Sequence, residues 1–108
     1  MISEQLSFLP DSLPDSHPFP PARERTVWNA LPQRVKDRFL KAGEAALAAA
    51  IAPLPLSLWL DFSHTGRRTA WEDAYFSRRA RLCALVCAEC VEHTGRFLDA
   101  IADTVWAL

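Results

Sequence analysis

The second half of the chain, residues 54–108, limits the possible folds more than any other feature, because its apolar side chains recur at helical spacing. The stripe at its end is made of large residues: Phe97, Leu98, Ile101, Val105, Trp106 and Leu108. No Gly, Pro or basic last turn follows this stripe to end a helix. An apolar stripe of this size must be buried against something. We therefore expect this chain to be the opening piece of a longer protein, whose activity lies in residues outside it.

Prolines mark the organisation of the first half. Residues 1–22 hold five of the eight prolines: Pro10, Pro14, Pro18, Pro20 and Pro21. Because proline fixes φ and cannot donate a backbone hydrogen bond, residues 1–22 are predicted to form an extended or disordered arm. Residues 23–108 are predicted to form the helical segment, with a short helix at residues 24–29. A longer helix is expected from about Pro32 through the alanine-rich residues 45–52 to a stop at Pro53.

Residues 54–62 carry an ambiguous pattern, in which Leu or Phe alternates with Pro, Ser, Trp and Asp. A period of two is typical of a strand. The rest of the sequence supplies no partner strand, and a lone strand would leave its backbone groups unpaired. We favour a short helix that begins at Pro55, and the extended alternative remains open.

The next helix has clear start and stop signals. Thr69 and Glu72 have the spacing of a capping box, in which each side chain accepts a hydrogen bond from the other residue's backbone amide. This helix is predicted to run to about His93, with Gly95 as its breaker, and a last helix is predicted from about Arg96 to the end. The sequence therefore predicts an all-α fold of antiparallel helical hairpins.

Bulk properties exclude several classes of function. The formal net charge of −1 gives no general attraction to nucleic acid or to an anionic membrane. With only three Gly, the chain has no glycine-rich phosphate loop. The longest apolar run, residues 45–60, is interrupted by prolines and too short to span a membrane. The N-terminus lacks the features of a secretory signal, so we expect a cytoplasmic location, or a periplasmic one if the true N-terminus lies upstream.

Three cysteines, Cys83, Cys87 and Cys90, have the C-x3-C-x2-C spacing that holds a [4Fe–4S] cluster in radical-SAM enzymes. Here the spacing falls within a strongly periodic helix, where the three residues share one face and no glycine loosens the backbone. Cysteine behaves as a small apolar residue in such a position. We therefore expect reduced core cysteines and neither metal nor cofactor.

Arginines and aromatic residues provide the most interesting candidate site. Five arginines lie close together in the sequence: Arg67, Arg68, Arg78, Arg79 and Arg81. With Trp59, Trp71 and Tyr75 nearby, they suit a groove for an acidic sugar polymer, because guanidinium groups pair with carboxylates and sulfates. The alternative, which charge runs generally favour, is a solvated face that pairs with Glu72, Asp73 and Glu89.

The sequence contains no recognisable set of catalytic residues. The three histidines, His17, His64 and His93, are scattered, and the simplest role for His93 is as a cation at a helix C-terminus. The acidic residues form no defined dyad.

Residues 54–108, about half of the chain, resemble the N-terminal part of heparinase II/III-type polysaccharide lyases. The resemblance rests on residues 58–62 (LWLDF), 65–68 (TGRR), Trp71-Glu72, 85–90 (LVCAEC) and 95–99 (GRFLD), and Trp28 to Pro32 extend it. These motifs are signatures of a fold rather than of catalysis.

This resemblance implies an α/α toroid of stacked helical hairpins that acts on uronic-acid-containing polysaccharides by β-elimination. The family's catalytic Asn, His and Tyr belong farther along the chain, so no catalytic residue is assigned here. We assign substrate binding to Arg67, Arg68 and Trp71, and expect the rest of the same polypeptide and an acidic polysaccharide as partners. The fragment alone is expected to be inactive and prone to self-association.

Two rival interpretations remain. The first is a small all-helical module that is complete in itself and packs on a partner protein. The second, more distant, is a radical-SAM cluster protein.

Overall fold

The computed structural model describes residues 18–108, which form helices and connections without a strand. The helices are α2 (Arg25–Asn29), α3 (Gln33–Ala48), α4 (Leu56–Thr65), α5 (Thr69–Glu92) and α6 (Leu98–Ala107). The predicted all-α class is confirmed for this part of the chain. Most of the predicted arm, residues 1–17, lies outside the described residues. Within residues 18–108, no helix is long and apolar enough to cross a membrane.

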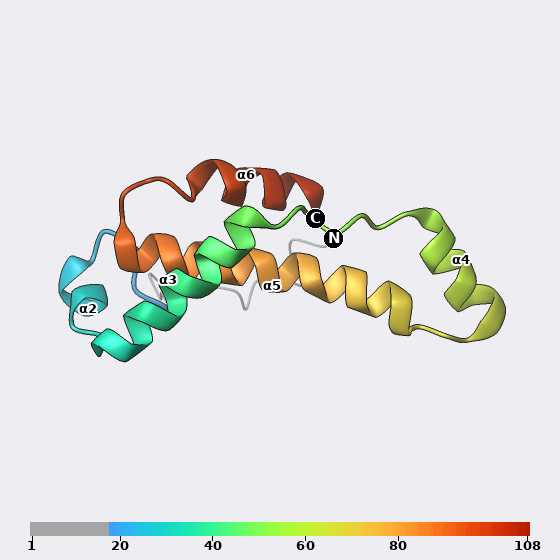
Figure 1. The fold of residues 1–108 in the computed structure, drawn as a ribbon, viewed down its shortest axis with the longest axis horizontal. Helices are drawn as coiled ribbons and strands as arrows, with labels where there is room; N and C mark the ends of the chain where they lie inside the picture. The colour runs from blue at the N-terminus through green and yellow to red at the C-terminus, as the bar shows by residue number, and fades with distance from the viewer. Residues whose placement is uncertain (1–17) are drawn as a thin grey trace, which may run out of the picture.

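The longest helix, α5, is the axis around which the others are arranged (Figure 1). Helices α3 and α6 run back along α5 in the opposite direction, and α3 crosses it obliquely. The contact between α3 and α5 is the most extensive in the structure. Helix α2 lies at the C-terminal end of α5, whereas α4 lies at its N-terminal end, away from the body formed by α3, α5 and α6.

A small core lies where α3, α5 and the start of α6 meet. Leu85, Ala88 and Phe97 are completely buried, and partly buried apolar residues pack against them: Leu40, Ala46, Ala100 and Ile101. Gly43 of α3 is buried directly against Ala88 of α5. A Cβ atom at residue 43 would meet the Cβ of Ala88 closer than two carbon atoms can approach. The missing side chain of Gly43 therefore allows α3 and α5 to cross at close range.

Residues 56–62 adopt the expected helical conformation, while Pro55 before them is extended. Helix α4 begins directly after Pro55, as predicted, and ends at Gly66, whose φ of 72° is in the left-handed region. Leu58 and Phe62, four residues apart, are half-buried, while Leu56, Trp59 and Leu60 are exposed. The alternating pattern is thus not a buried strand face, because burial in α4 follows the helical period.

The predicted capping box is wrong. Thr69 is already the first residue of α5, and Arg68 occupies the position before it. No side chain caps this end; the Glu72 amide donates instead to the Arg68 carbonyl over 2.8 Å. A threonine inside the helix is no longer placed to accept from the third helical amide, which explains the difference.

Other predicted boundaries shift by a few residues. Helix α3 ends at Ala48 rather than at Pro53, because Ala49 is extended with ψ 147°. Helix α5 ends at Glu92, within one residue of the predicted end, but His93 rather than Gly95 breaks it, because His93 already has left-handed geometry with φ 57°. Helix α6 begins at Leu98 rather than near Arg96, because the intervening residues form a turn.

Basic side chains satisfy the free carbonyl groups at four helix C-termini. Arg25 donates to the carbonyls of Cys90 and Val91 at the end of α5, over 2.7 and 2.9 Å. Lys36 donates to Asn29 at the end of α2, over 2.6 Å. Further donors are found at α3 and α6, where Arg81 contacts the carbonyls of Ala46 and Ala49, and Arg78 contacts that of Ala107. A cation at this end also interacts favourably with the helix dipole.

Candidate functional site

Four aromatic side chains form a cluster where α4 and α5 meet: Trp59, Phe62, Trp71 and Tyr75, here called the aromatic cluster. Trp71 and Tyr75 are one turn apart on α5 and stack with ring centroids 4.7 Å apart. Trp59 contacts Trp71 edge-on at 5.4 Å and Phe62 at 5.3 Å. These contacts hold α4 against α5, yet Trp59 remains 46% exposed.

Arginine side chains border the aromatic cluster. The guanidinium of Arg79 lies over the Tyr75 ring, 4.7 Å from its centroid, and donates to the Tyr75 hydroxyl. Arg68 forms an exposed ion pair with Glu72, with 3.3 Å between Nε and Oε1. An exposed aromatic ring such as Trp59 can stack on a ligand ring, and neighbouring guanidinium groups can pair with its anionic groups.

The three residues predicted to bind substrate all lie at this junction. Arg67 and Arg68 are exposed in the connection between α4 and α5, and Trp71 is half-buried in the aromatic cluster. The structure therefore brings them to the same end of the molecule. Their role in binding a sugar polymer stays a prediction.

The predicted cluster of five arginines divides into two groups, because Arg78 and Arg81 turn away from the aromatic cluster. Arg81 contacts the end of α3 and donates from Nε to the Thr104 hydroxyl over 3.0 Å. Arg78 contacts the end of α6. These two residues join α5 to its neighbours, so for them the prediction of a shared basic face is wrong.

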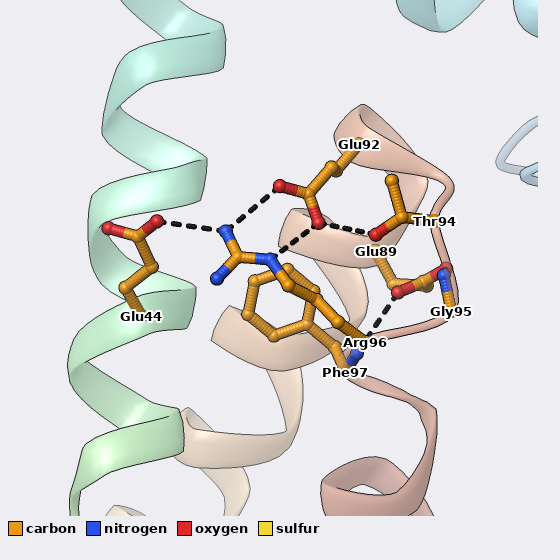
Figure 2. Close-up of polar contacts among 7 residues, drawn as sticks. All are labelled: Glu44, Glu89, Glu92, Thr94, Gly95, Arg96 and Phe97. Atoms are coloured by element: carbon orange, nitrogen blue, oxygen red, sulfur yellow. Dashed lines mark hydrogen bonds and ion pairs between the residues drawn. The ribbon is translucent and has the colours of Figure 1, made fainter.

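Glu89 also differs from its predicted role as a partner of these arginines. Its carboxylate is buried and accepts hydrogen bonds from the backbone amides of Gly95, over 2.7 Å, and Phe97, over 3.3 Å (Figure 2). Gly95 has a φ of 86°, which favours glycine, and Phe97 inserts into the core. Two of the segments that carry the family resemblance, residues 85–90 and 95–99, thus form a single structural unit.

Arg96 links this unit to α3 (Figure 2). Its guanidinium donates to both Glu92 carboxylate oxygens, over 2.6 and 2.9 Å, and to Glu44 of α3 over 2.8 Å. It also lies over the Phe97 ring, 4.5 Å from the centroid. Hydrogen bonds from Arg96 and from the Thr94 hydroxyl lower the pKa of Glu92. In turn, the carboxylates of Glu92 and Glu44 raise the pKa of Arg96. Glu89 and Arg96 join α5 to the start of α6 and to α3, and helical periodicity did not reveal these roles. The one sequence feature that could have indicated them is a glutamate, Glu89, within an otherwise apolar stretch.

The three cysteines lie along one side of a continuous helix. All of them line an apolar groove of about 490 Å³, together with Phe19, Pro20, Pro21, Ala22, Trp28, Leu82 and Val86. Burial raises the pKa of the Cys87 thiol, and the neighbouring cysteines raise it further; burial also raises the pKa of Cys90, against an opposing effect of Arg25. Cys87 and Cys90 are half-buried and Cys83 is exposed, so the core prediction is wrong for Cys83. In residues 18–108, no three His, Cys, Asp or Glu side chains could hold a metal ion.

The histidines of the described segment are exposed, His64 in the last turn of α4 and His93 at the end of α5. His17 lies outside the described residues.

In comparisons with known proteins, no family model and no curated protein matches this chain.

Proposed function

We propose that this chain is the N-terminal helical segment of a heparinase II/III-type polysaccharide lyase, in which it serves as structure and as one wall of the sugar groove. Arg67, Arg68 and Trp71 contact the acidic polysaccharide. The residues that remove the proton next to the uronate carboxylate in β-elimination lie outside this chain. The toroid of stacked hairpins is part of the same proposal.

The observation that carries the proposal is the aromatic cluster and its arginine border at the α4–α5 junction. Uronate rings have an apolar face and a carboxylate, and this surface offers one partner for each. A second support is the structural unit of Glu89, Gly95 and Phe97, which supplies a physical reason for the spacing between two of the motifs.

Binding tests the assignment of the site. We expect the chain to bind alginate and heparin in a salt-sensitive manner, since exposed charges are screened at high ionic strength. The double variant Arg67→Ala/Arg68→Ala should weaken binding about tenfold or more, and Trp71→Ala should weaken it similarly, as measured by isothermal titration calorimetry.

A matched control separates the site from net charge. Arg23 and Arg34 are exposed and lie away from the α4–α5 junction, so Arg23→Ala/Arg34→Ala removes the same charge elsewhere. This variant should retain binding, and neutral dextran should not bind. Equal loss in both double variants would overturn the assignment of Arg67 and Arg68.

The reaction is tested on the product of the complete reading frame that encodes this chain. With heparin, heparan sulfate and alginate as substrates, the absorbance of unsaturated uronate should increase with at least one of them. No increase with any of the three would overturn the lyase proposal.

The alternative of a helical interaction module is favoured by one observation, the exposed apolar side chains on α4 and α6 that include Leu56, Trp59, Leu98 and Trp106. If the chain binds no acidic polysaccharide, this alternative takes precedence.

A further inference from the structure

The outer side of α6 carries an apolar stripe. The inner side of this helix packs on α5 through Phe97, Ile101 and the fully buried Thr104. Leu98 and Val105 remain exposed on its flank, and Trp106 is 93% exposed. Leu98, Ala102 and Val105 have the i, i+4, i+7 spacing of one helical face, so together they present a straight ridge suited to another helix.

An acidic border runs beside this ridge. Asp99 and Asp103 are exposed, one turn apart, and adjoin the apolar stripe on the helical surface. Helix α6, from Leu98 to Ala107, contains no Lys, Arg or His. Its outer side is therefore both apolar and negatively charged.

From this juxtaposition we propose that the outer side of α6 is the docking surface for one amphipathic helix that carries Lys or Arg along a border of its apolar stripe. This helix comes from the same longer polypeptide as the chain, so the inference rests on the proposed function. A basic border would pair with Asp99 and Asp103, while the apolar ridges interlock around Trp106.

Charge also argues against a second copy of α6 as the occupant. Two α6 helices packed face to face would bring four aspartates together without a compensating cation from either helix. A partner helix with a basic border removes this repulsion.

The test uses two fluorescent amphipathic peptides of about 18 residues, about five helical turns, with the same apolar residues. One carries Lys along the border of the apolar stripe and the other carries Glu. By fluorescence anisotropy, the Lys peptide should bind the unchanged chain about tenfold more tightly than the Glu peptide. Asp99→Lys/Asp103→Lys should reverse this preference, and Trp106→Ala should weaken both peptides.

Two controls keep the result specific. Asp61→Lys/Asp73→Lys makes the same change of net charge at exposed positions on α4 and α5, and it should keep the preference for the Lys peptide. The second control is the single variant Asp103→Lys. Asp99 lies in the first turn of α6 and interacts favourably with the helix dipole, whereas Asp103 lies beyond that turn. This variant should therefore reduce the preference for the Lys peptide without a loss of helicity, as measured by circular dichroism.

Several results would overturn the proposal. These are equal binding of both peptides, the same loss of preference in Asp61→Lys/Asp73→Lys, or a dimer that Trp106→Asp dissociates, which would make a second copy the occupant. The readout differs from polysaccharide binding at the α4–α5 junction. A chain that binds alginate but neither peptide would refute only the docking surface, and the converse result would refute only the sugar site.

Discussion

At the scale of single residues, the connection between α5 and α6 depends on a few side chains with distinct tasks. Glu89 supplies both carboxylate oxygens to backbone amides, Gly95 supplies a left-handed conformation, and Phe97 fills the core. Because the Phe97 amide is buried, it needs an acceptor from within the protein. Glu89 is the residue that satisfies this requirement.

Replacement of Glu89 should therefore be costly. Glu89→Ala leaves the amides of Gly95 and Phe97 without their acceptors, which should reduce the free energy of unfolding by about 1–3 kcal/mol. Glu89→Gln should also destabilise the fold, because the side-chain NH2 group of glutamine would face the backbone N–H of Gly95 or Phe97, and two donors cannot form a hydrogen bond. Urea denaturation measures both effects, with the exposed Asp73→Ala as the control. A stability unchanged in Glu89→Ala would refute the role assigned to the carboxylate.

The pH dependence of stability should include a contribution from Glu92. Arg96 and Thr94 lower its folded pKa, so its contribution is complete above the unfolded value of about 4.3 and is lost as the pH falls through the folded value. Thermal unfolding of Glu92→Gln should therefore show a smaller decrease in Tm than the unchanged chain between about pH 5 and pH 3. Parallel Tm curves for the two proteins would contradict this account.

At the scale of the elements, helix packing is determined by small residues and by cations at helix ends. Gly43 permits the close crossing of α3 and α5 opposite Ala88. Arg25, Arg78 and Arg81 donate to the carbonyls at the ends of α5, α6 and α3, so each of these helices is attached through its C-terminus. Arginine is well suited to this because its guanidinium offers several donors on a planar group.

The crossing predicts a coupled pair of substitutions. Gly43→Ala should destabilise the protein by about 1–3 kcal/mol through overpacking, despite the better helix propensity of alanine. Adding Ala88→Gly removes the Cβ that causes the clash, so the double variant should be more stable than the sum of the two single changes predicts. Additive free energies of unfolding from a denaturant series would show that the two residues do not meet.

At the scale of the whole molecule, a small core contrasts with many exposed apolar side chains. Leu85, Ala88 and Phe97 are the centre of one packed region, while Trp106 and Leu56 are exposed on helices at its periphery. Apolar surface of this extent is characteristic of a segment that packs against further protein. The proposed lyase segment and the proposed docking surface on α6 both use this property.

Much of the fold was predictable from the sequence, and the candidate site less so. The positions of α3, α5 and α6 follow from apolar spacing, and the start of α4 follows from Pro55. The capping role of Thr69 was predicted wrongly, because a Thr-x-x-Glu spacing does not reveal where the first helical turn closes. The arginines at positions 67, 68 and 79 could be placed near aromatic residues because they are close in sequence.

Local patterns by themselves determined that this chain is helical, where most helices lie, and that residues 67–71 gather at one junction. Only the tertiary structure decided which charged groups join helices and which remain exposed. Arg81 and Glu89 look like surface charges in the sequence, yet one donates to the end of α3 and the other is buried beneath the start of α6. The reason is physical: helical periodicity depends on neighbours three or four residues away, whereas the partners of Arg81 lie 23, 32 and 35 residues away along the chain.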